Sequence, residues 1–95
     1  MPEATWEPYD SEMHGRLFAA ETSSLPDSCF AFPRTRKEPM TDARHVRNAI
    51  ARFNQVKDVT DFERDLAFAN IQKAADYFGI EMKEVDWHQL GSQRA

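Results

Sequence analysis

A thiol and an imidazole are the residues of this sequence best suited to covalent catalysis. Cys29 is the single cysteine, and a thiolate nucleophile needs a neighbouring base or positive charge, which His45, Arg34 and Arg36 could supply. However, Cys29 stands beside Phe30 in an apolar segment, and a buried free cysteine usually behaves as a small hydrophobic residue. We therefore expect Cys29 to be a packing residue, and we expect the protein not to be an enzyme.

The histidines and the acidic pairs show no pattern of a metal or cofactor site. The sequence contains neither an HxxxH nor a CxxC pair, and its histidines, His14, His45 and His88, belong to separate predicted elements. The pairs Asp61 with Asp65 and Glu81 with Glu84 are typical of solvated surface charge. Phosphate-binding glycine loops and nucleophile elbows are absent from the sequence. We expect no metal, no cofactor and no small-molecule ligand.

Positive charge is concentrated in the middle of the chain. Residues 1–28 hold six acids and one base (−5), residues 34–52 hold six bases and two acids (+4), and residues 53–95 hold eight acids and five bases (−3), which sums to the net charge of −4. A net negative charge argues against binding of nucleic acid by the whole surface. The basic middle is the distinctive surface, and it lies between two acidic flanks.

Cations of this basic middle and two aromatic residues near the N-terminus are the candidate partner-binding residues. The set is Arg34, Arg36, Lys37, Arg44, Arg47, Trp6 and Tyr9. We expect a protein partner, with a second copy of the chain as one candidate, because the acidic flanks complement the basic middle and an aromatic residue can anchor the contact. One alternative is a nucleic acid bound by the same cations together with Arg52. Another is a solvated face whose cations pair with Asp42, Glu38 and the flanks, while Trp6, Tyr9 and Trp87 only cap the core.

Two amphipathic helices are expected to position these cations. The first is capped by Thr41 or Asp42 and runs to about residue 54. Its apolar face consists of Val46, Ala49, Ile50 and Phe53, opposite Arg44, Arg47, Asn48 and Ala51. The second begins with the capping-box pattern from Thr60 to Glu63, runs to Phe78 and ends at Gly79. Its apolar arc is Ala67, Ile71, Ala74, Ala75 and Phe78.

Three shorter elements complete the expected fold. A short helix over about 11–21 would place Met13, Leu17 and Ala20 on one face. Extended segments at 29–32 and 36–40 would form a two-stranded ribbon with a basic tip, which is marginal unless helices cover it. A short helix over about 85–90 would be capped by Asp86 or Glu84 and stopped by Gly91.

The length of 95 residues allows a single domain of mainly helical α+β class. We expect residues 1–10 to be an N-terminal tail, residues 11–91 the domain and residues 92–95 a C-terminal tail. The sequence has no run of 18 apolar residues and no basic region ahead of an apolar N-terminal stretch, so we expect neither a membrane span nor a signal peptide. A lone cysteine fits a reducing cytoplasm.

Three segments carry a resemblance to a known family. They are "LPDSCFAFP" at 25–33, "HVRNAIARF" at 45–53 and "AADYFGIE" at 74–81. With their spacing, residues 24–90 resemble a small bacterial family of unknown function, whose segments also occur at the ends of tailed-phage prohead proteases and capsid-associated proteins. The resemblance implies a shared fold and a bacterial or phage setting, and it implies no mechanism.

Overall fold

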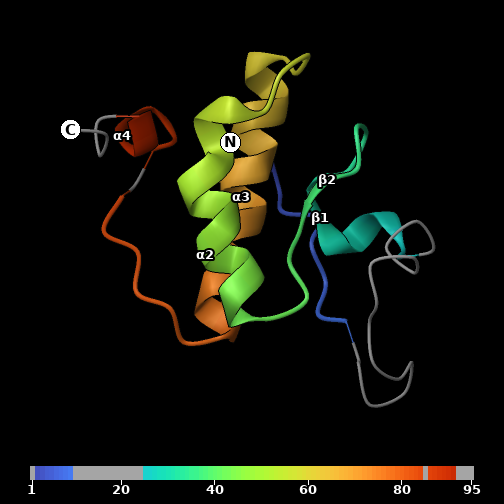
Figure 1. Cartoon of the computed structure of the whole chain (residues 1–95), viewed down its shortest axis with the longest axis vertical. Helices are drawn as coiled ribbons and strands as arrows, with labels where there is room; N and C mark the ends of the chain where they lie inside the picture. The colour runs from blue at the N-terminus through green and yellow to red at the C-terminus, as the bar shows by residue number, and fades with distance from the viewer. Residues whose placement is uncertain (1, 10–24, 85, 92–95) are drawn as a thin grey trace.

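The computed structural model describes residues 2–9, 25–84 and 86–91, and it has the expected α+β class with helices predominating. In chain order its elements are η2 (Asp27–Cys29), β1 (Phe30–Phe32), β2 (Lys37–Pro39), α2 (Ala43–Arg52), η3 (Phe53–Gln55), α3 (Asp61–Tyr77) and α4 (His88–Gly91). Figure 1 shows α2 and α3 packed together, with the β ribbon beside them and α4 on the opposite side. The helix expected over 11–21 and the tail at 92–95 lie outside the described residues.

The predicted ribbon is confirmed as a short antiparallel pair. Phe30 lies opposite Pro39, and Phe32 lies opposite Lys37. The strands are joined by a turn in which the N–H of Arg36 donates to the carbonyl of Pro33 at 3.3 Å, and Arg36 has a φ of 55°. A ribbon of this length is marginal alone. It is held because β1 packs on α3 and β2 packs on α2.

The first amphipathic helix, α2, is also confirmed. Asp42 is its N-cap, and the carboxylate Oδ1 accepts the N–H of His45 at 2.8 Å. Val46 and Ala49 are fully buried, as is Phe53 at the start of η3, while Ile50 is partly buried. The apolar face therefore turns to the core, and the opposite face remains in solvent, as the spacing of the apolar residues predicts.

Helix α3 has both predicted end signals. The Thr60 hydroxyl accepts the N–H of Glu63 at 3.1 Å, and the Glu63 carboxylate accepts the N–H of Thr60 at 2.9 Å. At the other end Gly79 adopts a φ of 73°, and the N–H of Ile80 donates to the carbonyl of Ala75 at 2.7 Å. This is a Schellman motif, and it stops the helix by satisfying its last carbonyls.

The core has one main cluster and a smaller one at the ribbon. The main cluster joins the apolar faces of α2 and α3 to β1, and it includes Trp6 and Phe68, which are both fully buried. The smaller cluster consists of Leu25, Cys29 and Phe30, with Tyr9 packed against it.

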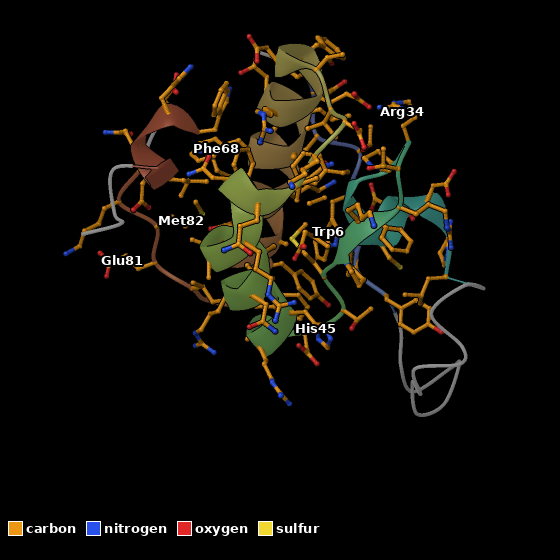
Figure 2. All side chains as sticks on the ribbon, turned by 45° about the horizontal axis from the view of Figure 1, so that its top comes forward. Trp6, Arg34, His45, Phe68, Glu81 and Met82 are labelled. Atoms are coloured by element: carbon orange, nitrogen blue, oxygen red, sulfur yellow. The ribbon has the colours of Figure 1, made fainter. Side chains whose placement is uncertain are left out.

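The N-terminal segment, which we expected to be a tail, packs on the core through Trp6. Residues 2–9 have no helix or strand, but they run along β1 and α3, and Figure 2 shows Trp6 pointing between the ribbon and the helices. Trp6 is 0% exposed. Its indole is therefore a core group, as in the alternative that Trp6 caps the core, and it is not exposed as a partner-binding anchor would be. Burying this large apolar surface on the nearby core stabilises the fold.

The last helix is shorter than expected. It begins at His88, whose N–H donates to the Asp86 carboxylate at 2.8 Å. The N–H of Asp86 in turn donates to the side-chain carbonyl of Gln89 at 3.1 Å. Gly91 is its last residue and not a stop beyond it. The indole N–H of Trp87 donates to Asp65 at 2.8 Å, so Trp87 fastens this end of the chain to α3 and Asp65 is not simply a solvated charge.

Candidate functional site

The ribbon and α2 present the predicted cations, but the structure divides them into two groups. Arg34, at the ribbon tip, forms a bidentate ion pair with Glu63 and also donates to the carbonyl of Asp58 at 2.8 Å. The Arg34 hydrogen bonds, followed by the N–H of Thr60, lower the pKa of Glu63 to about 2. Arg34 therefore closes the ribbon onto the start of α3, because Glu63 belongs to the first turn of that helix.

Arg36 has an internal role as well. Its guanidinium pairs with Asp27, donates to the carbonyl of Leu25 at 2.8 Å and lies 4.6 Å from the centre of the Phe30 ring. Both tip arginines are thus paired with the acidic flanks. This agrees with the alternative of internal pairing, although their partners are Glu63 and Asp27 and not Asp42 and Glu38.

The other predicted cations are exposed, and Arg52 and Lys57 are exposed as well. We use the name basic surface for Lys37, Arg44, Arg47, Arg52 and Lys57. On α2, Arg44, Arg47 and Arg52 fall within an arc of about 140° at 100° per residue. Within residues 2–9, 25–84 and 86–91, none of the five forms an ion pair.

A cavity of about 370 Å³ lies at the end of this surface. Its walls come from β2, the last turn of α2 and the connection to α3: Lys37, Glu38, Arg52, Gln55, Val56, Lys57 and Asp58. Burial raises the pKa of Glu38, and the charges of Arg52 and Lys37 act in the opposite direction. Three cations thus face two carboxylates, which leaves a net positive cavity in a molecule of net negative charge.

Two residues of the cavity wall have strained backbones. Glu38 has a φ of 59° and Asp58 a φ of 63°, a region in which a side chain other than glycine costs about 1 kcal/mol or more. The carbonyl of Asp58 is held by Arg34, so the ion pair at the ribbon tip also supports the cavity wall. Strained positions that the surrounding structure maintains are often found at binding sites.

The thiol and imidazole that could do covalent chemistry are engaged elsewhere. Cys29 is buried, and burial raises the pKa of its thiol, which disfavours the thiolate. The Nδ1 atom of His45 lies 2.7 Å from the Asp42 carboxylate at the start of α2, where Figure 2 shows its ring. In the described parts of the chain, no three histidine, cysteine or acidic side chains are grouped to hold a metal ion.

Two residues of this region are not among the predicted partner-binding residues. Lys57 lies in the connection between α2 and α3, and Glu38 was expected only as an internal counter-ion. The dense charge of residues 34–58 was the only available signal. The structure also separates Tyr9 from the basic surface, since Tyr9 packs on the small cluster at the ribbon.

Comparison with known proteins gives a family and nothing finer. The model of a family of unknown function, DUF6582, matches residues 19–85. No curated protein and no solved structure matches the chain. None of the helices found among the described residues has the length and apolar character needed to cross a membrane.

Proposed function

The chain belongs to DUF6582, a family of unknown function, and on that premise we propose that it is a non-enzymatic module that binds an acidic protein segment through its basic surface. The observation that carries the proposal is the division among the cations. Arg34 and Arg36 are bound internally, whereas Lys37, Arg44, Arg47, Arg52 and Lys57 are exposed without an ion pair to any described residue.

The absence of catalytic character in the candidate thiol supports the non-enzymatic part of this proposal. A reactive cysteine is exposed and has a lowered pKa, but the Cys29 thiol is buried and its pKa is raised. The strongest candidate for covalent chemistry therefore has the properties of a packing residue.

The cavity supports the preference for an acidic protein segment. Arg52 and Lys57 are among its lining residues, and it is large enough for an Asp or Glu side chain of a partner. The duplex of a nucleic acid would instead bring a dense row of phosphates past Glu38, Asp58 and Asp42, which lie among the cations. A flexible acidic segment can avoid these carboxylates by placing its own charges between them.

Titration with two anionic probes tests the proposal. The probes are a fluorescein-labelled decaglutamate peptide and a labelled DNA duplex of about 20 base pairs, each measured by anisotropy at low salt. Reversal of two adjacent charges by Arg44→Glu with Arg47→Glu should weaken peptide binding at least tenfold, because each reversal replaces an attraction by a repulsion. Both side chains face away from the core, so the helix should remain folded.

Lys83→Glu is the matched control, because Lys83 is exposed, forms no ion pair with the described residues and lies outside the basic surface. It should change peptide affinity less than twofold. Equal losses in the control and the α2 variant would refute the proposed surface. Tighter binding of the duplex, with a salt slope of about −0.9 for each phosphate contact, would replace the proposal by nucleic-acid binding.

We also propose a cytoplasmic, bacterial or phage setting, with a second copy of the chain as the first partner to test. The resemblance of residues 24–90 to segments of phage head proteins and the lone free cysteine support the setting. The charge distribution supports binding of a second copy, because residues 1–28 (−5) and 53–95 (−3) of one chain are complementary to residues 34–52 (+4) of another. Sedimentation across a salt series should show a dimer that dissociates as salt increases; a monomer at every salt concentration would exclude the second copy.

A further inference from the structure

The N-terminal segment of residues 2–9, which we call the strap, is bound in the manner of a peptide ligand. The indole of Trp6 is fully buried, and its ring N–H donates to the carbonyl of Met40 at 3.0 Å. The Trp6 ring makes T-shaped contacts with the rings of Tyr77 and Phe78, at centroid distances of 5.8 and 5.9 Å. An apolar anchor with one polar group satisfied at its tip is typical of peptide recognition.

One buried side chain binds the strap backbone. The Oδ1 atom of Asn70 accepts the N–H of Thr5 at 2.7 Å and the N–H of Trp6 at 2.9 Å. Its Nδ2 atom donates to the Thr5 hydroxyl at 3.3 Å and to the carbonyl of Ala31 in β1 at 3.0 Å. Among the described residues, Asn70 is the one buried polar side chain, and its hydrogen-bonding capacity is directed to an extended backbone.

The strap is also held after Trp6. The N–H of Glu7 donates to the carbonyl of Ser28 at 3.0 Å, and the Glu7 carboxylate lies 3.1 Å from the Nζ atom of Lys73. These contacts add a backbone bond and a charge pair to the Trp6 anchor. We use the name strap site for the residues that receive the strap, namely Ser28, Met40, Asn70, Lys73, Tyr77 and Phe78.

The strap site and the strap belong to different parts of the chain. Every residue of the strap site falls within the 19–85 segment that matches the family, whereas residues 2–9 precede that segment. The family domain thus contains a buried amide and an apolar seat for a tryptophan, and the group that occupies them comes from outside the matched segment.

We propose that the strap site is a peptide-binding site for an extended segment with a tryptophan followed by an acidic residue, and that the strap of a second copy can occupy it. Residues 10–24 connect the strap to the domain, and fifteen residues can span about 50 Å when extended. This reach allows the same contacts to be made within one chain or between two. The proposal goes beyond the basic surface, since the polar contacts of the strap in the described structure are to Ser28, Met40, Asn70 and Lys73, which are not among the five cations.

Cleavage of the connection in the folded protein tests whether the strap behaves as a ligand. A recognition sequence for a site-specific protease is inserted between Met13 and His14 of the full chain, and the folded protein is then cut. A fluorescent peptide with the sequence of residues 2–9 is titrated into the cut protein. We expect saturable binding with one peptide per domain, since the peptide can replace the cut strap.

Matched peptides and variants identify the contacts. The peptide with Trp6→Ala should bind about 30-fold more weakly, as loss of a central buried anchor usually does. Lys73→Glu in the protein should weaken binding of the wild-type peptide, because it places a carboxylate opposite Glu7. It should not weaken binding of a peptide with Glu7→Lys. The uncut chain should bind the peptide far more weakly than the cut chain, because its own strap competes at an effective concentration of about millimolar.

Three results would overturn the proposal. One is that the cut protein binds the wild-type and Trp6→Ala peptides with equal affinity. Another is that the cut and the uncut protein bind the wild-type peptide with equal affinity. The third is loss of the far-ultraviolet circular dichroism of the cut protein, which would show that the strap is a core element and not a ligand. The Arg44→Glu and Arg47→Glu substitutions should leave peptide affinity unchanged, so a failure of this proposal is distinct from a failure of the proposed function.

Discussion

Replacement of Asn70 by leucine should reduce the stability of this protein more than any exposed substitution in α3. The two side chains have comparable size, so the change removes hydrogen bonds without creating a large cavity. The N–H of Trp6 and the carbonyl of Ala31 are both buried and would lose their partner. At about 1–3 kcal/mol for each unsatisfied buried group, the expected loss in the free energy of unfolding is about 2–6 kcal/mol.

Urea denaturation followed by circular dichroism measures this loss, and tryptophan emission of the native protein shows whether the strap remains bound. If Asn70→Leu releases the strap, the emission should shift to longer wavelength as Trp6 enters water. Asn54→Leu, at an exposed position of η3, is the matched control and should stay within about 0.5 kcal/mol of wild type. An Asn70→Leu protein with wild-type stability and unshifted emission would refute the hydrogen-bond argument.

Three other substitutions or measurements test local parts of the fold. Phe53→Ala should lower the free energy of unfolding by about 3–5 kcal/mol, because Phe53 is fully buried between Phe32 and Trp87; an unchanged melting temperature would contradict this. The Cys29 thiol should react with a thiol reagent much more slowly in the native than in the unfolded protein, since it is buried and its pKa is raised; equal rates would place it in solvent. Glu63→Gln keeps the capping pattern but removes the charge that pairs with Arg34, and should cost about 1 kcal/mol at neutral pH. The pKa of Glu63 is about 2 in the native protein, below its unfolded value near 4.5. The stabilisation that ionised Glu63 gives the fold is therefore present above pH 4.5 and is lost as the pH falls towards 2. When the free energy of unfolding is measured from pH 7 to pH 2, it should fall less steeply for Glu63→Gln than for the wild type.

The parts of the fold that depend on neighbouring residues were predictable. Thr60 and Glu63 cap a helix by contacts three residues apart, and Gly79 ends the same helix by its own conformational freedom. The position of α2 likewise follows from the spacing of its apolar residues. The spacing also predicts the place of the ribbon, but the packing of β1 on α3 and of β2 on α2 holds it.

The parts that depend on distant residues were not predictable. Asn70 lies on a helix whose apolar arc does not include it, and its role becomes visible only when Thr5 and Trp6 arrive from the other end of the chain. The candidate site shows the same limit. Nothing in the local sequence around Arg34 indicates that Glu63 will neutralise it, so a basic tip was expected where the molecule has an ion pair.

The distance along the chain between Trp6 and its binding residues has a consequence for biosynthesis. Trp6 is made before the residues that bind it, because it precedes Asn70 by 64 residues and Tyr77 and Phe78 by still more. The ribosome therefore exposes the indole well before it completes the α3 helix that receives it, and a contact of such long range forms late in folding. A nascent chain stalled before residue 70 should present a solvated tryptophan to chaperones, whereas a chain extended beyond residue 78 and outside the exit tunnel should conceal it.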